Sequence, residues 1–173
     1  LERAGAHVAY GLLGLKTHSK IALVIRKEAG GLRRYAHIGT GNYHHKTARL
    51  YTDLGLLTAD RILTGDVTDL FNVLTGVAKK DVYRELLVAP KSMRPGIEAL
   101  IDGEIERHRE HGDGRIIIKC NAFVDPPMIQ KMYEASQAGV PIDLIVRGMC
   151  SLQPGVPGFS ESIHVRSIVG RYL

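Results

Sequence analysis

The tripeptide His18-Ser19-Lys20 holds the residue types best suited to chemistry in this chain. It stands at the head of the apolar run Ile21 to Ile25, which predicts a strand. Side chains two apart on a strand point to one face, so the imidazole and the ammonium are expected to converge. An imidazole is a nucleophile near neutral pH, and a lysine beside it can hold the phosphoryl oxygens that it attacks. The spacing predicts a catalytic pair, with His18 as the nucleophile and Lys20 as its partner.

A glycine-rich turn follows about twenty residues later, at Gly39-Thr40-Gly41-Asn42. We expect it to open a helix that runs to about Leu54. A glycine-rich turn at a helix N-terminus presents free N–H groups, which would form an anion site there. Asn42 is then the N-cap, a phosphate contact, or both. Tyr51 falls on the same expected helix, where its residue type favours packing beside Leu50 and Leu54.

Strands and one helix are expected to position these groups in the first half of the chain. The patterns predict a hairpin of strands 20–26 and 33–38 joined by a turn at 28–31. Apolar spacing predicts a helix over 66–75 that ends at Gly76. The polar stretch 79–81 is the expected boundary between two lobes.

The second half alternates between helices and strands. Helices are expected at 95–111 and 126–139, the second capped by Asp125, and strands at 115–119, 142–146 and 163–169. The first helix is expected to bury four apolar side chains: Ile97, Leu100, Ile101 and Ile105. Residues 115–147 therefore predict a βαβ unit with parallel strands. Arg147 would lie at the carboxyl end of its second strand, where open α/β sheets bind ligands, and an arginine fork suits phosphate.

Composition narrows the classes of partner. The 173 residues are 45% apolar and 24% charged, the balance of a globular protein, and no apolar run approaches the length of a membrane helix. The net charge of +5 favours a polyanion. With no Trp and 6% aromatic residues there is little to stack on bases, so no nucleic-acid partner is expected. Two cysteines suit a reducing cytoplasm and exclude a disulfide scaffold.

The order of the two motifs resembles two families. A His-x-Lys strand followed by a Gly-Ser/Thr-x-Asn turn looks like a degenerate phospholipase D superfamily motif. That motif also has an Asp five residues after the Lys, where this chain has Ile25. The chain is more similar to the polyphosphate kinase family that works through a phosphohistidine. The similar stretches are residues 14–20 (GLKTHSK), 35–42 (YAHIGTGN), 47–53 (TARLYTD), 56–60 (LLTAD), 133–140 (YEASQAGV), 144–150 (LIVRGMC) and 166–173 (RSIVGRYL).

The resemblance implies an α/β fold of two incomplete phospholipase-D-like lobes, with mixed sheets flanked by helices. Residues 1–82 would be the C-terminal part of the first, catalytic lobe, and 83–173 the N-terminal part of the second. The phosphate-accepting histidine falls on His18, a tyrosine that contacts nucleotide on Tyr51, and an arginine that grips nucleotide phosphates on Arg147. Geometry assigns Lys20 and Asn42 to phosphate contact.

The same resemblance implies that the parent protein transfers the terminal phosphate of ATP to inorganic polyphosphate, and the reverse, with ATP, ADP and polyphosphate as partners. It implies Mg²⁺ as cofactor, with no metal ligand expected within this chain because the residues linked to magnesium would precede Leu1. A second catalytic histidine would follow Leu173. The full-length protein is expected to be a cytoplasmic homo-oligomer, with association to a membrane left open.

Two alternatives stay open. A phospholipase-D-like phosphodiesterase would also use a histidine nucleophile but would cleave a diester without Mg²⁺. A non-catalytic polyanion-binding fragment would explain the charge without any reaction.

Overall fold

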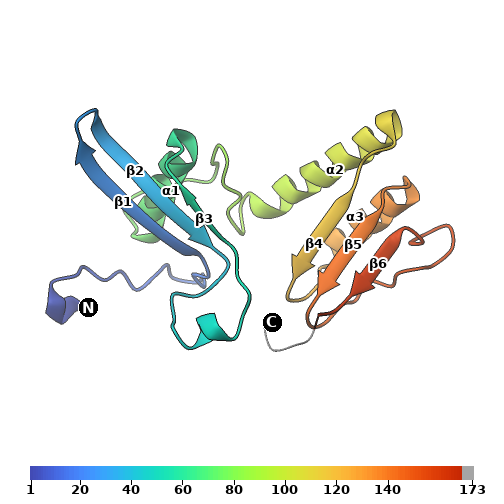
Figure 1. Ribbon diagram of the computed structural model, residues 1–173, viewed down its shortest axis with the longest axis horizontal. Helices are drawn as coiled ribbons and strands as arrows, with labels where there is room; N and C mark the ends of the chain where they lie inside the picture. Colours follow the sequence, from blue (N-terminus) through green and yellow to red (C-terminus); the bar gives the residue numbers. More distant parts are fainter. Residues whose placement is uncertain (169–173) are drawn as a thin grey trace. The chain divides into compact units, whose positions relative to one another are not determined.

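The computed structural model describes residues 1–168, which fall into two compact units, Leu1–Ser92 and the chain from Met93 onward (Figure 1). Each unit is described by itself. The division lies later than the expected lobe boundary at 82/83, which stays a prediction for the parent lobes. Contacts of residues 83–86 explain why the division lies later. Tyr83 is buried, and the backbone N–H groups of Arg84, Glu85 and Leu86 donate to Asp66, which ties this segment to the first unit.

The first unit is built on an antiparallel sheet of three strands in the order β1-β2-β3. These strands are Lys20–Glu28, Gly31–Gly39 and Gly55–Thr58. The predicted hairpin is confirmed: Lys20 pairs with Gly39 at one end, and Glu28 pairs with Gly31 at the other. Gly31 has a φ of 109°, a left-handed conformation that glycine adopts without strain. Residues 7–15, which the sequence leaves mixed, form no strand.

The helix expected from Asn42 to about Leu54 is wrong. The segment forms a loop with one short 3₁₀ turn, Thr47–Arg49, and the chain re-enters the sheet as β3. The pairing of Gly39 with Gly55 draws both ends of the loop together, which is incompatible with a helix of that length. Tertiary pairing has overridden the local pattern.

Helix α1, Arg61–Leu74, contacts both β1 and β2. It begins five residues before the predicted start at Asp66, because Asp60 caps it by accepting from the N–H groups of Ile62 and Leu63. Gly76, with a φ of 77°, follows its end as expected. Val67 and Leu70 of this helix are buried.

The second unit has a parallel sheet in the order β4-β5-β6, with β5 in the centre. The predicted βαβ unit is confirmed, since β4 pairs with β5 in parallel and α3 connects them. Helix α3 begins at Pro126 under an Asp125 cap that accepts from the N–H of Met128. Strand β6 ends at Arg166, earlier than the predicted 163–169, and Val169 lies outside the described residues. The bounds are α2 Met93–His111, β4 Ile116–Cys120, α3 Pro126–Gln137, β5 Ile142–Val146 and β6 Ile163–Arg166.

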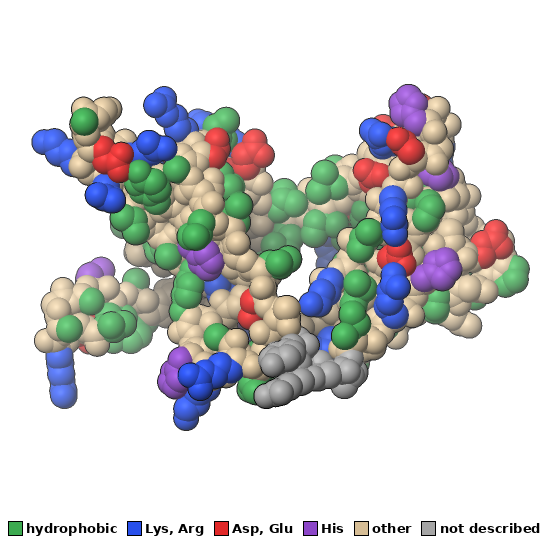
Figure 2. Space-filling view, in the orientation of Figure 1, with side chains coloured by type: hydrophobic (Ala, Val, Ile, Leu, Met, Phe, Trp, Pro, Cys, Tyr) green, Lys and Arg blue, Asp and Glu red, His purple; other side chains and the backbone are tan. Residues whose placement is uncertain are grey.

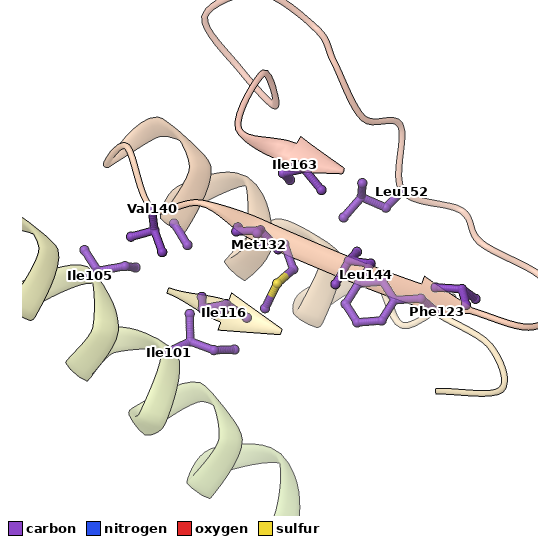
Figure 3. Packing of buried hydrophobic residues seen from close by; sticks show 12 residues of the cluster. Ile101, Ile105, Ile116, Phe123, Met132, Val140, Leu144, Leu152 and Ile163 are labelled. Atoms are coloured by element: carbon purple, nitrogen blue, oxygen red, sulfur yellow. The ribbon is translucent and has the colours of Figure 1, made fainter. Parts of the chain in front are cut away.

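Helices α2 and α3 pack on the sheet of the second unit around a cluster of twelve buried apolar residues (Figure 3). Ile142, Leu144 and Val146 alternate along β5 and face this core. Ile101 and Ile105 of α2 are buried as predicted, and Ile97 packs against the cluster. The predicted burial of Leu100 is wrong, because its side chain is 67% exposed.

Candidate functional site

The structure brings His18 and Lys20 together as the spacing predicts. Lys20 begins β1, and His18 lies just before it. The Lys20 Nζ atom is 3.0 Å from Nδ1 and 3.1 Å from Nε2 of His18, and it donates to the His18 carbonyl at 2.6 Å. An ammonium can only donate, so a hydrogen bond from Lys20 to either ring nitrogen requires that nitrogen to be unprotonated, and the tautomer of His18 decides which one accepts. Both side chains are solvent-accessible, and an imidazole and an ammonium therefore meet at the open end of a strand.

The register of the hairpin places the glycine-rich turn beside this pair. Because Lys20 is the partner of Gly39, residues 40–42 continue from β2 next to the start of β1. Asn42 is exposed, and its carbonyl accepts from the N–H of His44 at 2.7 Å. No helix begins at Asn42, so the expected helical anion site is wrong. The turn itself lies where the sequence analysis requires it.

Polar contacts hold the ends of the loop after β2. The Thr40 hydroxyl donates to Asp53 Oδ1 at 2.9 Å and accepts from the N–H of Leu54 at 3.0 Å, while the Thr40 N–H donates to the Leu54 carbonyl. A Cβ on Gly41 would overlap the Asp53 side chain, so only glycine fits there. Sequence analysis missed Thr40 and Asp53 as positioning residues. The sequence offered one signal for this role. Asp53 ends the stretch 47–53, and no pattern of apolar neighbours accounts for an acidic residue there.

His37 does not reach the His18 strand end as a partner. It is paired with Ala22, and its Nδ1 lies 2.6 Å from the Tyr43 hydroxyl, with the two rings 5.6 Å apart. A Cβ at Gly39 would come within 2.9 Å of its ring, so the imidazole lies over this part of the strand. His37 instead braces the loop through Tyr43, which sequence analysis did not single out.

Tyr51 follows the short 3₁₀ turn and lies on a loop, not on a helix. Its side chain is 41% exposed, and Leu50 and Leu54 are 59% and 80% exposed. The expected packing of Tyr51 beside these leucines stays a prediction. The aromatic side chain lies on the same loop as Asn42 and is accessible from solvent.

Arg147 lies where the sequence predicts, directly after the central strand of the second sheet. Its N–H donates to the Cys120 carbonyl at 3.1 Å, and its own carbonyl accepts from the Ser167 hydroxyl at 3.3 Å. The segments after all three strands are thus linked through the Arg147 backbone. The next residue is Gly148, where a Cβ would come 3.0 Å from the Asn121 carbonyl. This packing fixes the backbone from which the exposed Arg147 side chain extends.

Asp143 and the two cysteines of the second unit have no free reactive group of their own to offer at this edge. Asp143 on β5 pairs with Arg115 at 3.0 Å and with Arg166 at 2.5 Å, and the Arg115 hydrogen bond is the main cause that lowers the pKa of the Asp143 carboxyl. Burial raises the pKa of the Cys120 thiol, which makes it a poor nucleophile. Cys120 and Cys150 are both free. The assignment of Arg147 to phosphate stays a prediction from the sequence.

Residues 1–168 hold no group of three or more His, Cys, Asp or Glu side chains that could bind a metal ion. Within the same residues, no helix has the length and apolar character needed to cross a bilayer.

The chain is similar to polyphosphate kinases of several bacteria. The chain is 59% identical over its whole length to the polyphosphate kinase of Mycobacterium avium (strain 104), and 57% identical to that of Streptomyces coelicolor. It is 60% identical to the polyphosphate kinase of Prochlorococcus marinus (strain MIT 9313). The chain spans only about a quarter of these relatives, 24%, 23% and 24% of their lengths.

A solved structure shares the fold. The crystal structure of polyphosphate kinase from Porphyromonas gingivalis matches 99% of this chain with a TM-score of 0.88 and 40% identity, over 29% of its own chain. The expected α/β, phospholipase-D-like class is confirmed. Residues 1–80 match the family described as polyphosphate kinase C-terminal domain 1, and residues 86–173 match C-terminal domain 2. With both halves matched in order, the chain belongs to the polyphosphate kinase family.

Proposed function

We propose that the protein containing this chain transfers the terminal phosphoryl group of ATP to inorganic polyphosphate, and the reverse, through a phosphohistidine on His18. The observation that carries the proposal is the contact of Lys20 Nζ with the His18 ring at 3.0 and 3.1 Å, beside the turn at residues 39–42. The net charge of +5 suits polyanionic substrates.

The proposed reaction has two displacements. In the first, the unprotonated His18 ring nitrogen attacks the γ-phosphorus of ATP, the new N–P bond forms, and the bond from phosphorus to the bridging oxygen breaks as ADP leaves. In the second, a terminal oxygen of polyphosphate attacks the phosphohistidine, and the N–P bond breaks. The transition state is loose and spreads its charge over the equatorial phosphoryl oxygens.

Lys20 serves this reaction by moving between two acceptors. Its flexible stem lets the ammonium leave the His18 nitrogen and carbonyl and turn to the phosphoryl oxygens when substrate arrives. The lone pair of His18 is then free to attack, and the positive charge lies where negative charge develops. Asn42, on the adjacent turn, donates to phosphate in this scheme.

Tyr51 and Arg147 are proposed to bind the nucleotide. Tyr51 has an exposed ring on the loop that also carries Asn42, and Arg147 offers a bidentate fork from a rigid strand end. Mg²⁺ is proposed to arrive with the nucleotide, since this ion is bound largely through substrate phosphates. The free cysteines support a reducing cytoplasm, and the family resemblance extends the proposal to a homo-oligomer.

The test is labelling of the full-length protein with γ-³²P-ATP and Mg²⁺. We expect acid-labile, base-stable label in the wild type and none in His18→Ala. His7→Ala is the matched control, because His7 is also an exposed histidine ahead of β1, and it should take label like the wild type. Lys20→Met should slow labelling about 10² to 10³-fold, the usual loss of a group that stabilises transition-state charge.

Equal label in wild type and His18→Ala would reject His18 as the nucleophile. A folded wild type that takes no label but binds polyphosphate would favour the polyanion-binding alternative. Hydrolysis of a phosphodiester without Mg²⁺, lost in His18→Ala, would favour the phosphodiesterase.

A further inference from the structure

A pocket of about 620 Å³ lies at the end of the β1–β2 hairpin away from His18. Its volume is in the range of small-ligand sites. It is formed by the hairpin turn, the first part of β2 and the start of α1. The lining residues are Glu28, Gly30, Gly31, Leu32, Arg33, Arg34, Ala59, Arg61 and Thr64. None of them belongs to the site described above.

The charged side chains of this pocket are mostly cationic. Three are arginines, Arg33, Arg34 and Arg61, and the one carboxylate, Glu28, already accepts from the Tyr35 hydroxyl at 2.7 Å. In the part of the chain that the structure describes, none of these arginines is in an ion pair. Figure 2 shows Lys and Arg side chains gathered around this end of the hairpin. The pocket thus concentrates positive charge that the fold itself does not neutralise.

A fourth arginine, outside the pocket lining, lies on the neighbouring strand. Arg26 is directly opposite Arg33 in the hairpin register, and like charges opposite one another on a sheet destabilise it. Arg33 also lies over the Tyr35 ring, 5.5 Å from its centroid, which orients its guanidinium. An anion bound here would relieve the repulsion.

The backbone of β2 is available at the same place. Strand β3 pairs only with residues 36–39 of β2, so the pocket end of β2, residues 31–35, has no described strand on that side. Backbone N–H groups on an unpaired strand edge can donate to phosphate oxygens. The pocket lining therefore combines arginines with main-chain donors, the two kinds of group that bind condensed phosphates.

We propose that this pocket is a second polyphosphate-binding site, remote from the site of phosphoryl transfer, which holds an internal segment of a long chain. The proposal rests on the function proposed above, since it takes polyphosphate as the polymer. Eight residue steps along β1 separate Lys20 from Glu28, about 26 Å at 3.3 Å per residue. A long chain can occupy both sites, and tripolyphosphate is too short to do so.

The test compares the full-length wild type with Arg33→Gln/Arg34→Gln, using end-labelled long-chain polyphosphate and fluorescence anisotropy. We expect Kd for the long chain to rise about tenfold, because charge-assisted hydrogen bonds are lost. The slope of log K against log salt should fall by about two, one for each lost phosphate contact. Affinity for tripolyphosphate should not change.

The matched control is Lys79→Gln/Arg109→Gln, which removes the same charge from two exposed side chains outside the pocket. Its Kd should stay within about twofold of wild type, since distant exposed charges are screened by salt. Arg33→Lys/Arg34→Lys keeps the charge and should recover most of the affinity. Arg61 lines the pocket from α1 and not from the hairpin, so Arg61→Gln alone should also raise Kd for the long chain.

The outcomes separate this inference from the proposed function. Labelling of His18 by ATP needs no polymer, so it should be equal in the wild type and in the pocket variants. Absence of label in the wild type would reject the proposed function. Normal label together with unchanged long-chain Kd in the Gln variant, or an equal loss in the control, would reject the pocket alone. Single-stranded RNA that competes as well as polyphosphate at equal charge would also overturn it.

Discussion

The two units of the chain differ in how they are held together. The second unit buries twelve apolar side chains in one cluster between its helices and its sheet. In the first unit the buried apolar residues are Ala36, Val67, Leu70 and Tyr83, and two polar residues, Thr64 and Asp66, are buried with them. Leucines 13, 54 and 57 of the first unit are more than three-quarters exposed.

This difference matches the division of chemical roles proposed above. The second unit offers Arg147 from a strand whose inward face is wholly buried, so the backbone that carries the guanidinium is rigid. The first unit offers His18, Lys20 and Asn42 from a strand end and a loop, which hydrogen bonds such as Thr40–Asp53 hold in place. A nucleophile that must accept a phosphoryl group needs access, and access limits the apolar core that can surround it.

The largest expected effect tests the core of the second unit. Leu144→Ala should lower the free energy of unfolding by about 3 to 4 kcal/mol, because Leu144 is fully buried and its removal leaves a cavity. Leu57→Ala in the first unit removes the same atoms from a side chain that is 81% exposed and should cost under about 0.5 kcal/mol. Urea denaturation measures both. Similar losses would contradict the contrast between the units.

The next effect tests the polar anchor of the first unit. Asp66 Oδ2 accepts from the N–H groups of Arg84, Glu85 and Leu86 at 2.8, 2.7 and 3.2 Å. Burial by itself would raise the pKa of this carboxyl, but the backbone hydrogen bonds outweigh burial and lower the pKa below its ordinary value. Asp66→Asn removes the charge from these bonds and should cost about 2 kcal/mol at neutral pH.

The pH dependence of this anchor has a definite sign. Because the pKa of Asp66 is lowered on folding, the stabilisation is fully present above about pH 4 and is lost as the pH falls through the folded-state value. The difference in unfolding free energy between wild type and Asp66→Asn should therefore shrink in acid. A difference that is constant from neutral pH to below pH 3 would show that the charge is not responsible.

The smallest expected effect is a gain in the free energy of unfolding that should be similar in the two units. Gly65 in α1 and Gly103 in α2 lie inside helices, and a Cβ at either would meet nothing within 4 Å. Alanine at each should raise the free energy of unfolding by about 0.5 to 1 kcal/mol, because glycine loses more backbone entropy in a helix. The check is the urea midpoint of each single variant. If only one of the two alanine variants lost stability, the added methyl group would be crowded at that position.

Sequence patterns predicted most accurately the elements that depend on contacts between near neighbours in the chain. The βαβ unit followed from apolar runs, the Asp125 cap and the proline after it, and strand 142–146 was predicted to the residue. The hairpin of the first unit followed from its turn and its strands. These elements depend on contacts between near neighbours in the chain, which the order of residues encodes directly.

The loop between β2 and β3 could not be predicted in the same way. Residues 42–54 read as a helix, but the pairing of Gly39 with Gly55 and the Thr40–Asp53 bond close them into a loop. The exposure of Leu100 and the role of Tyr43 were missed for the same reason, since each depends on which distant surface faces the residue.

By itself the sequence determined the family, the closeness of His18 and Lys20, and the place of Arg147 at a strand end. Residue types and short spacings are sufficient for these features, because side-chain direction on a strand is set by the backbone. Only the tertiary structure decided that the Asn42 turn lies beside Lys20, that Tyr51 is exposed, and that arginines meet at the far end of the hairpin. Those arrangements arise from strand register, which joins residues far apart in the chain and is chosen by the whole fold.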